Sequence, residues 1–339
     1  ISLPADIVEE VLRIDGLDNI DIAGSITMSP SVEEKYTKEA YKEKVSNYLV
    51  GPGFNEIMTN SITNSFFYNE EELQESVKMI NNLSAELDTM RPSMVETGLQ
   101  SIAYNLNHKN NNLKFFEFGK TYKTTGVGKY EEQEHLCLYI SGNANEAGWR
   151  SKSSKADFYV LKGIVANVLQ LLGLGIEKFE HFENEKLING LQQVINNEVI
   201  VQMGEVNQKT LAMFDIKQPV LFADLNWDIL SQEAGNNKIK FKVIPKFPAV
   251  HRDLAIIVPS VLKYEEIEKV VQKTRLTNLQ EVKLFDIFES EKLGAGKKSM
   301  AISFTFLNEE KTLTDKEIDG WMNMIMNTLE KELHAEIRK

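Results

Sequence analysis

Apolar positions in residues 1–50 recur at the spacing of amphipathic helices. A first stripe follows Pro4 and stops at Gly16, residues that favour the start and the end of a helix. Its members are Ile7, Val8, Val11 and Leu12. A second helical pattern begins near residue 30, and the Gly51-Pro52 pair ends it. We therefore predict two helices here.

Residues 55–230 alternate between the period of a strand and the period of a helix. Strand patterns occupy 55–63, 113–122, 134–142 and 220–230. Helical patterns occupy 91–107 and 157–173. A hairpin is predicted to turn at Asn196-Asn197, and the polar residues 231–240 are predicted to be a linker. This order predicts an α+β domain on a largely antiparallel sheet.

The last part of the chain has a definite order of patterns. Strands are predicted at 251–258, 279–289, 300–308 and 335–339. Helices are predicted at 264–274 and 313–333. The second helix begins with a capping box formed by Thr314 and Glu317. The order βαββαβ is that of the split ferredoxin-like unit, and we expect its sheet to have one face under the helices and one open face.

The composition is that of a globular protein. A chain of 339 residues, with 42% apolar and 26% charged residues, suggests two domains. No run of about 18 apolar residues exists, so no membrane partner is expected. Cys137 is the single cysteine, which excludes an internal disulfide and favours a reducing, cytoplasmic location. Because the chain begins with Ile1 and has no charged-then-apolar leader, we expect a fragment of something longer.

The net charge of −12 is unevenly distributed. Residues 246–339 hold nearly equal numbers of basic and acidic residues, so the earlier residues carry almost all of the acidic excess. A nucleic-acid coat relies on summed neutralisation of phosphates, which this balance disfavours, and we expect no DNA partner. If RNA is bound locally, residues 246–339 are the less repulsive place.

Two sets of motifs carry a resemblance. FPAVHRDLAIIV at 247–258, followed by VKLFDIFESEKLGAGKKSMAISFTF and TLTDKEID, closely resembles the ferredoxin-like anticodon-binding domain of bacterial phenylalanyl-tRNA synthetase β subunits. Upstream, DIVEEVLRIDGLDNI, MRPSMVETGLQSIAYNLNHKNNNLKFFEFGKTY and the predicted helix at 157–172 resemble the same subunit in the same order. The resemblance covers essentially the whole chain, and the chain looks like the C-terminal portion of such a subunit.

The resemblance implies three parts. Residues 1–24 would be the end of a truncated upstream domain, residues 25–235 a catalytically inactive class II synthetase-like domain, and residues 246–339 the ferredoxin-like anticodon-binding domain. The family works as a cytoplasmic α2β2 heterotetramer, a ligase that attaches phenylalanine to tRNA(Phe) with ATP. The chain would then be a noncatalytic part that docks the α subunit and binds the anticodon region of the tRNA.

A class II active site needs two charge-stabilising arginines. One stands two residues before a Glu on a central strand, where this sequence has Phe115 before Glu117. The other ends a Gly-rich strand, and the late strand at 220–230 has neither a glycine run nor an arginine. We therefore expect no catalytic residues in this chain, which agrees with the family, where the α subunit carries the active site.

Three acids in the first predicted helix form the candidate metal site. Asp6, Glu9 and Glu10 are spaced i, i+3 and i+4 and share one helical face. Acids in a first helical turn are also favoured by the helix dipole alone, so a solvated face is the alternative. The resemblance implies a Mg²⁺ site shared with the α subunit. A further family Asp would precede Ile1, so we expect the set here to be incomplete.

The open face of the predicted ferredoxin-like sheet is the candidate RNA-binding surface, because such sheets stack unpaired bases on aromatic rings. Strand alternation allows at most about a third of its phenylalanines to face outward. These are Phe285, Phe288, Phe304 and Phe306. Lys297 and Lys298 are the phosphate candidates. Arg252, adjacent to Asp253, either fixes the start of the first strand in an ion pair or contacts RNA.

The remaining residues give weaker signals. The five histidines show no metal-ligand spacing, and Cys137 lies in an apolar strand where a packed small hydrophobe is expected. No nucleophile and base are recognisable as a pair. Two alternative functions stay open, a self-contained class II enzyme with an unusual site and a free-standing RNA-binding or scaffold protein.

Overall fold

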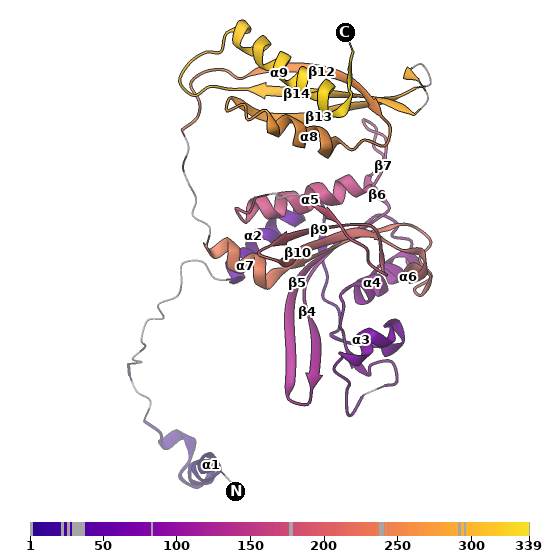
Figure 1. Cartoon of the computed structure of the whole chain (residues 1–339). Helices are drawn as coiled ribbons and strands as arrows, with labels where there is room; N and C mark the ends of the chain where they lie inside the picture. The colour runs from indigo at the N-terminus through magenta and orange to yellow at the C-terminus, as the bar shows by residue number, and fades with distance from the viewer. Residues whose placement is uncertain are drawn as a thin grey trace. The chain divides into compact units, whose positions relative to one another are not determined.

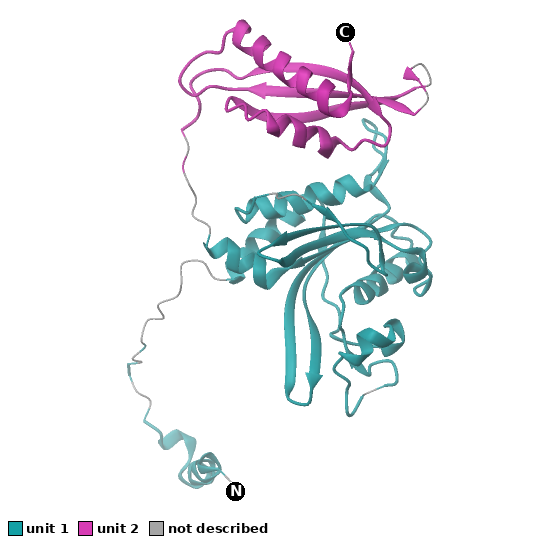
Figure 2. Cartoon of the chain, in the orientation of Figure 1, with its two compact units in different colours: residues 1–239 teal, residues 240–339 magenta. Residues whose placement is uncertain are grey.

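The computed structural model describes residues 3–21, 24–25, 28, 38–82, 84–175, 179–236, 241, 243–290, 293–294 and 296–338. The chain divides into two compact units, residues 1–239 and 240–339, which are coloured separately in Figure 2. We describe each unit by itself. In the described part of the chain no helix is both long and apolar enough to cross a membrane.

Unit 1 is built on a seven-stranded sheet in its described residues (Figure 1). From one edge to the other the strands are β1 (Asn55–Glu56), β4 (Leu113–Gly126), β5 (Lys129–Ser141), β11 (Val220–Asn226), β10 (Glu198–Val206), β9 (Leu187–Ile195) and β8 (Glu180–His181). Neighbours pair antiparallel except β1 and β4, which are parallel. The largely antiparallel sheet that the sequence predicts is confirmed.

Helices pack on both faces of this sheet. One face carries α2 (Lys38–Val50), α5 (Phe158–Leu171) and α7 (Trp227–Asn236), whose apolar residues join Phe116, Leu138 and Ala223 in one core cluster. The other face carries α4 (Val95–Asn107) and α6 (Gln208–Ala212), which pack on Phe115, Tyr139 and Phe222. Because successive strand residues point to opposite faces, the two clusters share the same strands.

Smaller elements surround the sheet. They are α1 (Pro4–Asp15), η1 (Leu17–Asn19), the pair β2 (Ile62–Thr63) and β3 (Thr89–Met90), η2 (Ser65–Phe67), α3 (Glu70–Gln74), and the pair β6 (Asn143–Asn145) and β7 (Ser154–Lys155). The hairpin predicted at Asn196-Asn197 joins β9 to β10, and both asparagines have positive φ, 52° and 67°. Positive φ at both central residues is the geometry that a two-residue hairpin turn requires.

Three predictions for unit 1 are wrong in their bounds. The strand predicted at 55–63 breaks into β1 and β2, which belong to different sheets, because the Thr59 backbone N–H between them is bound by the Glu117 carboxylate. The strand predicted at 220–230 ends at Asn226, whose Oδ1 accepts from Ile229 N as α7 begins. The linker predicted at 231–240 is helical to Asn236.

Unit 2 has the predicted βαββαβ order. Its elements are β12 (Val250–Pro259), α8 (Tyr264–Lys273), β13 (Leu279–Glu289), β14 (Lys297–Phe306), α9 (Asp315–Leu333) and β15 (Glu336–Ile337). The sheet order is β13-β14-β12-β15, and both helices pack in one cluster with Ile256, Ile302 and Phe304. The capping box predicted at Thr314 and Glu317 is present. The ferredoxin-like fold and its open face are confirmed.

Candidate functional site

The open face of the unit 2 sheet has a hollow of about 350 Å³. Its lining residues come from three adjacent strands and are His251, Asp253, Glu281, Lys283, Phe285, Ser303 and Thr305. The strand register brings them together, since Asp253 and Lys283 both pair with Ser303. The hollow therefore combines the phenyl ring of Phe285 with hydrogen-bonding groups on a sheet.

A bulge in β13 gives this face its aromatic side chains. Leu284 pairs with Ile302 while Asp286 pairs with Ala301, so Phe285 is an extra residue in the strand. Phe285 and Phe288 are 54% and 51% exposed. Strand parity without the bulge would place these two phenylalanines on opposite faces. The expectation that at most a third of the four phenylalanines face outward is wrong, because two are exposed and the other two are buried.

The charges on the open face are mixed. By register, Asp253, Glu281 and Asp286 share the face with Lys283. His251 Nδ1 lies 3.0 Å from Thr305 Oγ1, which fixes the ring at one end of the hollow. The face therefore offers donors and acceptors suited to the polar edges of bases, whereas the excess of carboxylates does not favour phosphates.

Arg252 lies on the opposite side of the strand from Asp253. Its Nη2 is 2.8 Å from Oδ1 of Asp315, in the first turn of α9. An ion pair that fixes the start of the strand therefore exists, but its acid is Asp315 instead of the adjacent Asp253. The two side chains are 36% and 87% exposed, so the pair contributes little to stability.

The two lysines predicted to contact phosphate lie at the start of β14. Lys297 forms an ion pair with Glu336 of β15. Lys298 pairs in the ladders with Val258 and Glu289, and the described residues give it no ion pair. The structure therefore places all three predicted RNA-binding cations, Arg252, Lys297 and Lys298, outside the lining of the hollow.

A buried ion pair lies on the face of the unit 1 sheet that carries Glu117. Glu117 is 1% exposed, and its Oε1 lies 3.1 Å from Arg91 Nη1. Thr59 donates to the same carboxylate from its backbone N–H and its hydroxyl, at 3.1 and 2.9 Å. The sequence did not reveal the role of Arg91, because Glu117 is 26 positions away and the residues adjacent to Arg91 give no sign of this partner.

Nε and Nη1 of Arg91 make further hydrogen bonds. Nε donates to the carbonyl of Lys120 at 2.8 Å, and Nη1 lies 2.6 Å from Thr59 Oγ1 and 3.3 Å from Thr97 Oγ1. Arg91 is 2% exposed. Its guanidinium is therefore committed to the protein and is not presented to a nucleotide phosphate.

Helix α4 covers the neighbouring part of the same face. A Cβ on Gly98 would lie 2.1 Å from Cε1 of Tyr139, so only a glycine permits this close approach. The Tyr139 hydroxyl donates to the carbonyl of Met94 at 2.7 Å. Phe115, at the position where a class II site needs an arginine, is buried in this packing. Phe115 is therefore a core residue of this face of the sheet.

A hydrogen-bonded row that the sequence did not reveal crosses this face. His135 Nδ1 lies 2.7 Å from Asp224 Oδ1, and its Nε2 lies 2.8 Å from Thr121 Oγ1. Thr121 and His135 are 6% and 7% exposed, so the hydroxyl has little access to a substrate. Burial also raises the pKa of the adjacent Cys137 thiol well above its usual range, which keeps the thiol protonated. These groups form a polar network that is only partly buried, because the Asp224 side chain is 26% exposed and lines a hollow of about 360 Å³ together with His135.

The predicted metal ligands lie on α1. Asp6 Oδ2 accepts from the backbone N–H of Leu3 at 3.0 Å, and Glu10 pairs with Arg13 at 2.8 Å. In the described residues no group of three or more His, Cys, Asp or Glu side chains is arranged to hold a metal ion. The acids Asp6, Glu9 and Glu10 therefore do not form a ligand set by themselves.

Comparisons with known proteins agree with the two units. Residues 25–227 match the family described as the phenylalanyl tRNA synthetase beta chain CLM domain. Residues 245–338 match the ferredoxin-fold anticodon binding domain.

Relatives align along the whole chain. The phenylalanine–tRNA ligase beta subunit of Bacteroides thetaiotaomicron is 37% identical over 98% of this chain and 42% of its own length. Those of Porphyromonas gingivalis and Listeria innocua are 33% identical over 100% of this chain and 43% and 42% of their own lengths. The chain spans less than half the length of these curated relatives.

Proposed function

Because the chain belongs to the family of phenylalanine–tRNA ligase beta subunits, we propose that it is the noncatalytic C-terminal part of such a subunit. In this proposal unit 1 docks the α subunit of an α2β2 assembly, and unit 2 binds the anticodon region of tRNA(Phe). The assembled enzyme attaches phenylalanine to the tRNA with ATP and Mg²⁺ in the cytoplasm.

The open face of unit 2 is the observation that carries the RNA-binding part of the proposal. A hollow of about 350 Å³ lies beside the exposed ring of Phe285, with Asp253, Lys283 and Ser303 in its lining. A ring of this kind can stack on an unpaired base while the polar groups bond the edges of the base. Phosphate contacts are assigned to Lys298, which the register places beside Val258, at the other end of the sheet from the hollow. Lys298 has no ion pair in the described part of the chain.

The placement of Phe115 and Arg91 in unit 1 supports the noncatalytic assignment. Phe115 and the committed guanidinium of Arg91 leave no free arginine beside Glu117 among the described residues. In this proposal, the ATP-binding site therefore belongs to the α subunit. The Mg²⁺ site stays a prediction that requires both subunits, because the described residues of this chain include no group of acids arranged to hold a metal ion.

A substitution in the hollow tests the RNA-binding part. In the assembled enzyme, Phe285→Ala should weaken tRNA binding about 5- to 100-fold, the range expected for loss of one base-stacking ring. Met324→Ala, which removes an exposed apolar side chain from α9, is the matched control and should leave affinity unchanged. Equal affinities for the wild type, Phe285→Ala and a deletion of residues 246–339 would remove unit 2 from tRNA recognition.

A further inference from the structure

A small two-stranded arm, made of β6 and β7, projects from unit 1 just after the end of β5 (Figure 1). It lies at the end of β5 that is far from the turn joining β4 to β5. We call residues 143–155 the β6–β7 arm. Asn143 pairs with Lys155 and Asn145 with Ser154 in its ladder. The Gly148 backbone N–H donates to the Ser151 carbonyl at 2.9 Å, which closes the turn at the tip.

The root of the arm is fixed to the body of unit 1. Gly142 has a φ of +89°, and a Cβ there would lie 2.1 Å from the carbonyl oxygen of Asn111. The Asn143 backbone N–H donates to Asn112 Oδ1 at 2.9 Å, and the Ala156 N–H donates to the Gly142 carbonyl at 3.0 Å. Side chains beyond the root are therefore presented from an anchored base.

The tip exposes a tryptophan almost completely. Trp149 is 97% exposed, whereas Trp227 is fully buried and Trp321 is stacked on Phe306 with ring centroids 5.5 Å apart. Covering a large exposed ring with a partner removes apolar surface from water and so favours binding. The exposure of Trp149 therefore leaves its ring available to a partner.

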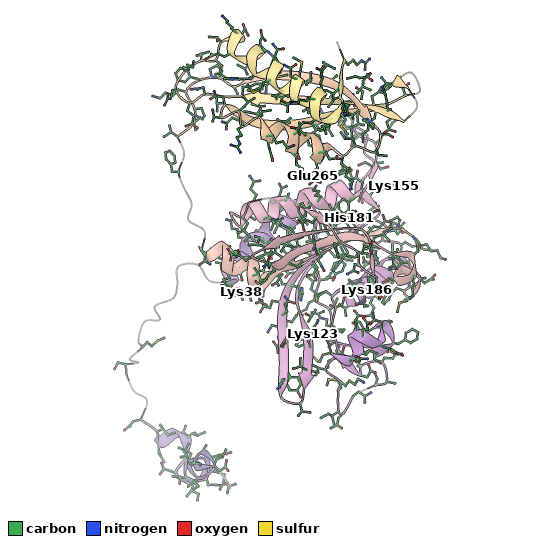
Figure 3. The ribbon with its side chains drawn as sticks, viewed as in Figure 1. Lys38, Lys123, Lys155, His181, Lys186 and Glu265 are labelled. Carbon is green, nitrogen blue, oxygen red and sulfur yellow. The ribbon has the colours of Figure 1, made fainter. Side chains whose placement is uncertain are left out.

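The charge beside Trp149 indicates the kind of partner. Arg150, Lys152 and Lys155 are all exposed, and Glu146 is the one acid in the arm. Within the described residues no carboxylate forms an ion pair with any of these three cations. Figure 3 labels Lys155 on the arm. A cluster of unpaired cations on a chain of net charge −12 favours an anionic partner.

We propose that the β6–β7 arm is a second RNA-binding element of this chain. Trp149 stacks on an unpaired base, and Arg150, Lys152 and Lys155 contact phosphates of the same strand, the combination by which single-stranded RNA is held without sequence specificity. The inference rests on the proposed function only in taking tRNA as the ligand. It assigns to unit 1 an RNA contact separate from the hollow on unit 2.

Tryptophan emission gives the direct test. Of the three tryptophans only Trp149 is fully exposed, so RNA that stacks on it should quench emission and protect it from iodide. Titrating the chain with tRNA(Phe) at low salt should produce both effects. Trp149→Phe should abolish both while keeping most of the affinity, and Trp149→Ala should weaken binding about 5- to 100-fold. Unchanged emission at saturating tRNA would overturn the arm assignment.

Charge reversals provide the second test. Arg150→Glu combined with Lys152→Glu should lower the slope of log affinity against log salt by about 1.5, the value for two lost phosphate contacts. Lys209→Glu combined with Lys217→Glu changes the net charge equally at exposed positions elsewhere in unit 1 and should leave most of the slope intact. Equal slopes for the two double variants would contradict the proposal.

The two proposals fail in different ways. If the wild type binds tRNA and Phe285→Ala weakens it, while every arm variant binds like the wild type, the arm inference alone is wrong. If the wild-type chain binds no tRNA even at low salt, both are wrong. Quenching of Trp149 by the α subunit, with none by tRNA, would assign the arm to a protein interface and overturn the RNA assignment.

Discussion

Replacing Arg91 by Met should strongly destabilise unit 1. The substitution removes a guanidinium with four hydrogen-bond partners. It leaves the Glu117 carboxylate buried with Thr59 as its one remaining donor among the described residues. Leaving one partner of a buried ion pair uncompensated typically costs about 3–5 kcal/mol. For a unit of this size that corresponds to a fall in Tm of about 6–20 °C.

Arg252→Met is the matched control. It breaks the Arg252–Asp315 pair, whose 2.8 Å contact is shorter than the 3.1 Å between Arg91 and Glu117. Because that pair is exposed, its loss should cost about 0–1 kcal/mol. The comparison separates the effect of burial on the free energy of unfolding from the effect of contact distance. The shorter, exposed ion pair is expected to contribute less to stability than the longer, buried one.

Urea unfolding of the three proteins, followed by circular dichroism and by intrinsic fluorescence, measures the two free-energy differences. Glu117→Gln together with Arg91→Met should recover part of the loss, since the buried charge is then gone. The reasoning is refuted if Arg91→Met costs no more than Arg252→Met. In that case the guanidinium would not be structural, and a role in binding phosphate would have to be reconsidered.

Three further results are expected. Gly98→Ala should destabilise unit 1 by about 1–3 kcal/mol because its Cβ would meet Tyr139, whereas Gly163→Ala, which meets nothing within 4 Å on α5, should be neutral or stabilising; thermal unfolding compares them. The purified chain with ATP, Mg²⁺ and phenylalanine should show only background pyrophosphate exchange, and exchange that Glu117→Ala abolishes would contradict the noncatalytic assignment. Lys311 and the Thr314 cap lower the pKa of Glu317 from 4.5 to about 2, so the stability that Glu317→Gln removes should be complete above about pH 4.5 and vanish as the pH falls through about 2; urea unfolding at several pH values tests this sign.

Local patterns predicted much of the fold. The capping box at Thr314 and the turn at Asn196-Asn197 depend on neighbours within a few residues, so the sequence displays them. The end of β11 was misplaced because the apolar run continues through Asn226 into α7. Asn226 itself was the available signal, since its side chain bonds the first turn of that helix.

The site was less predictable, because its partners are distant in sequence. Arg91 meets Glu117 only after β4 and the segment before α4 are packed together, and Arg252 meets Asp315 across 63 positions. Residue type and spacing could show that Phe115 replaces a charge. They could not show which group then satisfies Glu117, since that depends on long-range packing.

The bulge in β13 has a consequence for how the strand tolerates changes in length. Leu284 and Asp286 pair with the consecutive residues Ile302 and Ala301, so the ladder continues as though Phe285 were an insertion. Loss of the single codon for Phe285 would remove this bulge and leave the pairs on both sides of it in place, Phe288 and Ser299 included. The hollow would lose its ring while the fold kept its register. Related chains can therefore gain or lose this aromatic contact by one insertion or deletion, without passing through a misfolded intermediate sequence.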